Sequence, residues 1–353
     1  MELSVQPFTV HKRFPLTISR GTSSQNTNLW VRIKDQEIEG WGEATPFSVT
    51  TEGYKNTSSL LEELEQLTSS LKSLTPLDRQ SIEAILTEKQ ASSAVRAAID
   101  IALYDWLGKK ANLPLWRLWG LDRRKIVPIS VTVGITSPEA AKQRVRNWRQ
   151  VLEPEIIKVK LGSPNGIEAD QAMLLAILEE APQARITVDA NGGWSLDNAL
   201  LMGDWLAQQG VEYIEQPLPV GEEDKLAILY QHSPLPIFVD ESCFSSQDII
   251  RLAACVHGIN IKIMKSGGLS EAIKMIHLAK VCGLKVMFGC YSDSTLANTA
   301  MFHLAPLADY LDLDSHLNLV DDPFTGVKLE QGRLLPNDLP GLGVTLTVNS
   351  YKL

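Results

Sequence analysis

The sequence predicts an α/β protein in which a barrel of parallel strands follows a smaller α+β unit. Short apolar segments, each with a charged or polar residue at its C-terminal end, recur about every 25 residues from Lys160 to Asp314, the length that one strand, one helix and two short loops need. The chain has 353 residues, more than the roughly 200–250 that one such barrel requires, so a second unit is expected.

Residues 1–122 differ in pattern from the rest and predict an α+β domain. Residues 29–33 and 38–43 alternate around a polar turn, which is typical of an antiparallel hairpin. The polar stretch 17–28 predicts a loop. Leucine and alanine recur at helical spacing in 56–74 and 91–109, so two helices should follow the strands.

The barrel is predicted over residues 123–322. Eight strands fit between 126 and 315, and serines such as Ser137, before Pro138, begin the intervening helices. No eighth barrel helix is evident after Asp314. The segments 326–330 and 344–348 have strand character, so residues 323–353 are expected to return to the N-terminal unit and complete it.

Composition excludes several classes of function. The net charge is −9 and no basic run occurs, so nucleic acid is not an expected partner. No apolar stretch approaches the roughly 20 residues that span a bilayer, and the first residues lack the form of a signal peptide. The four cysteines lack a CxxC spacing and predict free thiols, which favours a cytoplasmic location.

Three carboxylates end consecutive predicted strands: Asp189, Glu215 and Asp240. The C-terminal ends of barrel strands meet at one face, where three carboxylates would repel one another without a cation between them. All-oxygen ligation favours Mg²⁺, with Mn²⁺ as the other candidate. The alternative is that each carboxylate caps a helix or pairs with a lysine.

Three lysines belong to the same predicted face. Lys158 and Lys160 are two residues apart on one strand and therefore point to the same side. Lys265 follows an apolar run three strands later, so Lys160 and Lys265 are predicted on opposite sides of the metal. Burial and nearby like charge would lower a lysine pKa and suit it to act as a general base.

Two bases and a divalent ion around one carbon suggest a specific chemistry. The ion would bind a substrate carboxylate and stabilise the enediolate that forms when the neighbouring C–H loses its proton. One lysine would remove that proton and the other would deliver one from the opposite face. This arrangement favours racemisation or epimerisation over elimination.

These motifs resemble the enolase superfamily, muconate-lactonizing-enzyme subgroup, over nearly the whole chain. The resemblance includes residues 40–44 (Gly-Trp-Gly-Glu-Ala) and 189–194 (Asp-Ala-Asn-Gly-Gly-Trp). It implies a modified TIM barrel, (β/α)₇β, with an α+β capping domain and bound Mg²⁺. It also implies that Lys160 and Lys265 are the acid/base pair and that Lys158 assists near the substrate carboxylate. Asp189, Glu215 and Asp240 would hold the metal.

Asp312-Leu313-Asp314 resembles the Asp-x-Asp signature of dipeptide epimerases. The resemblance implies that these carboxylates bind the ammonium group of a dipeptide and that the α-carbon of its C-terminal residue is epimerised. Barrels of this kind commonly assemble, so a homo-oligomer is expected. An o-succinylbenzoate synthase or muconate cycloisomerase of the same subgroup is the alternative, and a catalytically silent binding barrel is a third.

Two further residues bear on which dipeptide is used. Arg20 resembles the arginine that holds a glutamate side chain in L-Ala-D/L-Glu epimerases, although the loop departs from that pattern after Arg20. Asp293 lies where the family often has glutamate, and it could favour a polar or cationic substrate.

Overall fold

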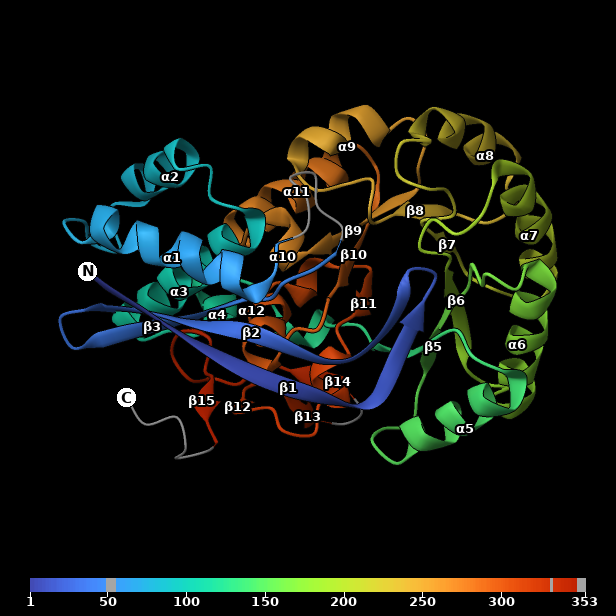
Figure 1. Ribbon diagram of the computed structural model, residues 1–353, viewed down its shortest axis with the longest axis horizontal. Coiled ribbons are helices and arrows are strands. Elements are labelled where there is room, and N and C mark those ends of the chain that lie inside the picture. The colour runs from blue at the N-terminus through green and yellow to red at the C-terminus, as the bar shows by residue number, and fades with distance from the viewer. Residues whose placement is uncertain (49–54, 331–332, 348–353) are drawn as a thin grey trace.

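The computed structural model describes residues 1–48, 55–330 and 333–347, and it contains a barrel of eight parallel strands beside an N-terminal α+β domain (Figure 1). The barrel strands are β4 (Ser130–Val133), β5 (Ile156–Lys160), β6 (Arg185–Asp189), β7 (Ile214–Glu215), β8 (Ile237–Val239), β9 (Gly258–Lys262), β10 (Lys285–Gly289) and β11 (Tyr310–Asp312). Each pairs with its neighbours in sequence, and a bridge from Ile129 to Leu311 joins the first strand's start to the last strand. The predicted fold class is confirmed.

Helices connect the strands and cover the outside of the barrel. They are α5 (Pro138–Arg149), α6 (Ile167–Glu180), α7 (Leu196–Gln208), α8 (Leu226–His232), α9 (Ser246–Leu252), α10 (Ile263–Ser266), α11 (Leu269–Val281) and α12 (Thr295–Phe302). Ser137 and Ser195 accept hydrogen bonds from the first turns of α5 and α7, as the sequence predicts. Figure 1 shows α5 to α8 along the outer side of β5 to β8.

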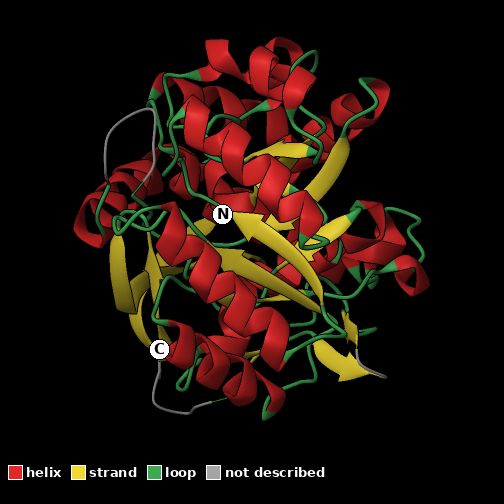
Figure 2. Cartoon of the chain, turned by 90° about the vertical axis from the view of Figure 1, so that its right-hand side faces the viewer, coloured by secondary structure: helices red, strands yellow, loops and turns green. Residues whose placement is uncertain are grey.

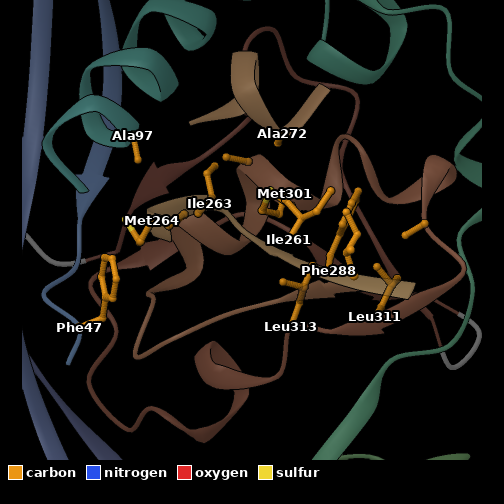
Figure 3. Packing of buried hydrophobic residues seen from close by; sticks show 14 of the residues in the cluster. Phe47, Ala97, Ile261, Ile263, Met264, Ala272, Phe288, Met301, Leu311 and Leu313 are labelled. Atoms are coloured by element: carbon orange, nitrogen blue, oxygen red, sulfur yellow. The ribbon is translucent and has the colours of Figure 1, made fainter. Parts of the chain in front are cut away.

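The strand residues that face these helices form the apolar layer of the barrel. Ile261, Phe288 and Leu311 occupy one row across β9, β10 and β11, and all three are buried. Figure 3 shows this row packing with Met301 of α12. Because side chains alternate along a strand, the neighbouring residues of these strands point into the barrel. The polar residues of the site come from that inward set.

The N-terminal domain contains the antiparallel sheet β1 (Glu2–Ile18), β2 (Gly21–Asp35) and β3 (Ile38–Ala44). Its helices are α1 (Thr57–Leu71), α2 (Arg79–Glu88), α3 (Ser93–Ala111) and α4 (Leu115–Leu118). The hairpin and both predicted helices are present. The predicted loop over 17–28 is wrong, because β1 and β2 continue as a two-stranded ribbon that turns at residues 19–20. Threonine pairs such as Thr9–Thr27 join the two strands, so polarity here marks a solvated ribbon.

The C-terminal segment forms two small sheets of its own. After β11 a short 3₁₀ turn (Ser315–Asn318) replaces an eighth barrel helix. β12 (Phe324–Thr325) pairs with β15 (Thr345–Leu346), and β13 (Lys328–Glu330) pairs with β14 (Arg333–Leu335). Within the described residues these four strands pair with one another and not with β1, β2 or β3. Instead Phe324 packs edge-on against Phe8 and Trp30 of that sheet.

Figure 2, a view turned by 90° from Figure 1, shows helices packed around the strands. No described helix has both the length and the apolar character needed to cross a bilayer.

Candidate active site

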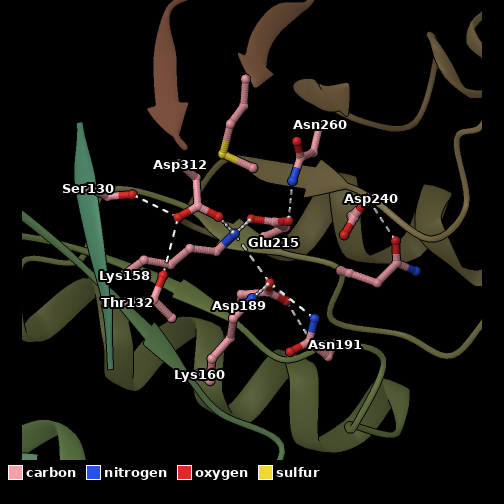
Figure 4. A network of polar contacts seen from close by, with 12 residues as sticks. Ser130, Thr132, Lys158, Lys160, Asp189, Asn191, Glu215, Asp240, Asn260 and Asp312 are labelled. Atoms are coloured by element: carbon pink, nitrogen blue, oxygen red, sulfur yellow. Dashed lines mark hydrogen bonds and ion pairs between the residues drawn. The ribbon is translucent and has the colours of Figure 1, made fainter. Parts of the chain in front are cut away.

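The inward-facing residues of β5 bring two buried lysines to the C-terminal end of the barrel. Lys158 is fully buried, and its Nζ lies 2.6 Å from Glu215 Oε2, 2.6 Å from Asp312 Oδ2 and 3.3 Å from Asp189 Oδ2. Lys160 Nζ donates to Asp189 Oδ2 at 2.6 Å. Figure 4 shows both lysines directed at this group of carboxylates. A solvated pair of edge lysines is therefore excluded.

The three carboxylates predicted to hold a metal lie at the ends of neighbouring strands and are fully buried. Asp189 ends β6, Glu215 ends β7 and Asp240 follows β8. Burial and the charge of Asp189 raise the pKa of Glu215 to about 7. Burial opposes ionisation of Asp189 as well, but Lys160 and Lys158 outweigh it and lower the pKa of Asp189 to about 2. Repulsion between these groups is thus only partly offset by the lysines.

This donor set fits a hard divalent ion in its chemistry. Three buried carboxylates supply oxygen ligands alone, and their mutual repulsion favours a cation. In the part of the chain that the structure describes, however, no three His, Cys, Asp or Glu side chains are close enough together to hold a metal ion. Lysine ammonium groups lie against these carboxylates instead. Asp189, Glu215 and Asp240 remain the residues that could hold the ion.

The structure brings Lys262, and not Lys265, to the cavity that Lys160 lines. β9 ends at Lys262, and residues 263–266 form the single turn of α10, where a continuing strand had been expected. Lys262 Nζ lies 2.6 Å from Asp240 Oδ2 and shares the cavity with Lys160.

Lys265 is placed elsewhere. Its Nζ donates to the Asp240 carbonyl at 2.5 Å, to Asp240 Oδ1 at 2.6 Å and to the Asn260 carbonyl at 3.0 Å. It lines a separate cavity of about 340 Å³, together with Phe47 and Phe244. The expectation that Lys265 stands opposite Lys160 is therefore corrected.

The sequence does contain a signal for Lys262. Asn260 and Lys262 alternate with Ile259 and Ile261, so the polar pair faces the barrel interior. Asn260 Nδ2 donates to Glu215 Oε1 at 2.8 Å, which confirms that orientation. A position three residues further along an extended strand would face the opposite side.

The lysine pKa values also differ from expectation. Burial alone would lower the pKa of Lys158, but the charges of Asp312, Glu215 and Asp189 outweigh it and raise the pKa well above its ordinary value. The same balance, with Asp240 as the main anion, raises the pKa of Lys262. Like-charge repulsion between lysines is thus smaller than attraction to the carboxylates.

Asp312 and Asp314 lie together at another side of the same cavity. Asp312 Oδ1 accepts hydrogen bonds from Ser130 Oγ at 3.0 Å and Thr132 Oγ1 at 3.3 Å, while Oδ2 meets Lys158. Asp314 Oδ2 accepts from the Thr132 N–H at 2.7 Å. Burial and the neighbouring Asp312 raise the pKa of Asp314 to about 7. Among the described residues, no lysine or arginine pairs with Asp314 as Lys158 pairs with Asp312.

Arg20 lies at the tip of the β1–β2 ribbon and reaches across to the barrel. Its Nη2 lies 2.7 Å from Glu241 Oε1, and its Nη1 donates to the Asn191 carbonyl at 2.9 Å. Ser19 Oγ donates to the same carbonyl at 3.1 Å. These contacts hold the tip of the ribbon against the C-terminal ends of the barrel strands. The guanidinium of Arg20 is thus already paired with the carboxylate of Glu241.

Asp293 is buried behind the cavity wall and does not line the cavity. It accepts a hydrogen bond from the Tyr291 N–H at 3.2 Å, and burial raises its pKa to about 6. The wall itself is Tyr291, whose ring stacks on Phe47 with centroids 4.5 Å apart. Lys262 Nζ lies 4.4 Å from the centroid of that ring. The sequence gives no sign that Phe47 stacks on Tyr291.

The shared cavity has a volume of about 370 Å³ and lies between the strand ends and the β1–β2 ribbon. Its lining includes Lys160, Lys262, the Asp312–Asp314 pair and the aromatic wall, and the buried carboxylates of Asp189 and Asp240 lie next to these lysines. A space with both signs of charge on its walls can take a small zwitterionic molecule.

Comparison with known proteins agrees with this geometry. Residues 1–120 match the family "Mandelate racemase / muconate lactonizing enzyme, N-terminal domain", and residues 139–350 match "Enolase C-terminal domain-like". A hydrophobic dipeptide epimerase of Roseobacter litoralis is 44% identical, over 98% of this chain and 99% of its own. An L-Ala-D/L-Glu epimerase of Bacteroides thetaiotaomicron is 33% identical, over 98% of this chain and 88% of its own.

A solved structure shares the whole fold. It is a dipeptide epimerase from Enterococcus faecalis, complexed with Mg and the dipeptide L-Leu-L-Tyr. It is 31% identical, superposes with a TM-score of 0.90, and the match covers 98% of this chain and 99% of that one.

Proposed function

Because the chain belongs to the mandelate racemase and muconate lactonizing enzyme family of the enolase superfamily, we propose that it is a Mg²⁺-dependent dipeptide epimerase. The observation that carries the proposal is the meeting of Lys160, Lys262 and the Asp312–Asp314 pair in one cavity. The relatives named as dipeptide epimerases, similar over nearly the whole chain, support it.

The carboxylate pair supplies the site for the substrate ammonium group. Lys158 already neutralises Asp312, so the ammonium would interact most strongly with Asp314, which has no such partner within the described residues. A charge-assisted hydrogen bond in this buried setting would fix the first residue of the dipeptide. A lyase or cycloisomerase of the same family has no use for this pair, which is why we favour the epimerase.

The two lysines supply the proton transfers. With the substrate between them, Lys160 Nζ and Lys262 Nζ would approach the α-carbon of the second residue from opposite faces. One takes the α-proton and the other returns a proton, so the configuration of that carbon is inverted. We assign Lys262 the role that the family resemblance implied for Lys265.

Asp189, Glu215 and Asp240 would hold Mg²⁺. The bound ion would supply positive charge beside the substrate carboxylate, which stabilises the negative charge left when the α-proton departs, and would free the lysines from these carboxylates. Lys158 stays buried next to the same carboxylates and keeps them in place.

The side chain of the second residue would meet the wall of Tyr291 and Phe47 beside Lys262. This wall is aromatic, and the nearby Arg20 is paired with Glu241, so an apolar side chain fits it best. The higher identity to the hydrophobic dipeptide epimerase than to the L-Ala-D/L-Glu epimerase agrees with that preference.

The test is α-proton exchange in D₂O with Mg²⁺ present, followed by mass spectrometry and NMR. A panel of L-Ala-Xaa dipeptides would include leucine, glutamate and lysine as the second residue. We expect deuterium at the α-carbon of the second residue and the formation of its epimer, fastest with leucine, and loss of epimer formation in Lys160→Ala. Absence of exchange with every dipeptide would overturn the proposal.

A further inference from the structure

One end of the cavity carries a lysine that the proposed chemistry does not use. Lys12 lies in β1 where that strand leaves its register with β2, between His11 and Leu16. The departing segment lies along the chain that follows β11: Lys12 bridges to Leu319, and Phe14 exchanges two hydrogen bonds with Asn318. This packing brings Lys12 to the cavity beside Asp314.

Lys12 has little to balance its charge. Its Nζ donates to Ser23 Oγ at 3.0 Å, and within residues 1–48, 55–330 and 333–347 no carboxylate comes within 4.0 Å of it. Burial lowers the pKa of Lys12, and the charge of Asp314 only partly opposes this.

A second cation, Arg144, lines the same end of the cavity. Its guanidinium lies over the ring of Phe14, at 4.7 Å from the centroid, and donates to the Pro15 carbonyl at 3.4 Å. In the same described ranges it too lacks a carboxylate within ion-pair distance, and burial lowers its pKa. Two partly desolvated cations without an anion favour an anionic group from a ligand.

We propose that Lys12 binds the side-chain carboxylate of a dipeptide whose first residue is aspartate or glutamate. This inference rests on the proposed function. The ammonium of that residue would lie at Asp314, so its side chain starts next to Lys12. The first residue then has its ammonium group beside Asp314 and its side-chain carboxylate beside Lys12. A basic first residue would meet repulsion from both Lys12 and Arg144.

The experiment compares two matched substrates, L-Glu-L-Leu and L-Gln-L-Leu, which differ in one charge. We expect the wild-type enzyme to favour L-Glu-L-Leu in kcat/KM by about tenfold, the effect of one charge-assisted hydrogen bond in a half-buried site. Lys12→Met should bring the ratio close to one, and Lys12→Arg should retain most of it. Lys280→Met, on the exposed side of α11, is the matched control and should keep the wild-type ratio.

The outcomes separate this inference from the proposed function. Exchange of both substrates with a wild-type ratio near one, or a ratio that Lys12→Met leaves unchanged, would overturn the role of Lys12 while leaving the epimerase intact. Exchange of no dipeptide would overturn the proposed function itself. The wild-type ratio requires no substitution, so the inference stays testable if a variant folds poorly.

Discussion

Replacing Lys262 and Lys265 by methionine, one at a time, separates a catalytic lysine from a structural one. Lys265 Nζ satisfies three buried acceptors, two from Asp240 and one from Asn260. Its removal leaves them without a donor, and breaking a buried pair of this kind costs about 3–5 kcal/mol of folding free energy. Lys262 makes one such contact, to Asp240 Oδ2, and Asp240 keeps its ion pair with Lys265 when Lys262 is removed. Its removal should cost roughly 1–3 kcal/mol.

The catalytic effects should have the opposite order. Loss of a general base lowers the rate by about 10²–10⁴-fold, so Lys262→Met should show that loss in kcat for L-Ala-L-Leu. Because Lys265 does not contact the substrate in the proposed mechanism, the kcat of Lys265→Met per folded molecule should fall by about tenfold or less at saturating Mg²⁺.

The assay combines urea unfolding with the rate at which L-Ala-L-Leu is converted to its epimer, and activity is normalised to the folded fraction. Folded Lys265→Met enzyme that epimerises more slowly than Lys262→Met would refute the assignment. Equal stability losses in the two variants would show that the contacts of Lys265 are not the ones described.

Two further predictions concern the site, and a third concerns Glu43, a buried carboxyl group of β3. Asp314→Asn should lower kcat/KM for L-Ala-L-Leu by about tenfold or more, because the ammonium loses a charge-assisted hydrogen bond; an unchanged value would count against the binding of the ammonium there. Dialysis against EDTA should stop exchange and added Mg²⁺ should restore it, whereas exchange that persists would exclude the metal. Burial and Asp293 raise the pKa of Glu43 from 4.5 to about 7. The folded state then binds this proton more tightly than the unfolded state does. The free energy of unfolding of the wild type, relative to Glu43→Gln, should therefore be highest below about pH 4.5 and fall by about 3 kcal/mol as the pH rises through 7. Urea unfolding of both proteins at pH 5 and pH 8 measures this difference, and a difference that does not change with pH would contradict the prediction.

The barrel could be predicted because its strand ends follow a regular spacing. Asp189, Glu215 and Asp312 end β6, β7 and β11 as expected. The second lysine was misplaced because the sequence does not mark where β9 stops. Ile263 and Met264 are as apolar as a strand, yet they belong to α10, and only the alternation of Asn260 and Lys262 identifies the inward face.

Other features of the site depend on contacts between residues far apart in the chain. The ribbon of β1 and β2 reads as a polar loop because neither face of its outer half is buried in the core. Arg20 and Glu241 are 221 residues apart, and no local pattern links them. The pairing of Phe47 with Tyr291 is equally hidden, since one comes from the N-terminal domain and the other from the barrel.

The most direct test of the account is the stereochemistry of exchange in two single-lysine variants. Lys160→Ala and Lys262→Ala are each incubated in D₂O with L-Ala-L-Leu and, separately, with L-Ala-D-Leu, and the α-deuterium is followed by mass spectrometry. If the two lysines serve opposite faces of one carbon, neither variant epimerises, and each exchanges only one epimer, a different one for each variant. If both variants exchange the same epimer, or either exchanges both, the two lysines do not flank the reacting carbon.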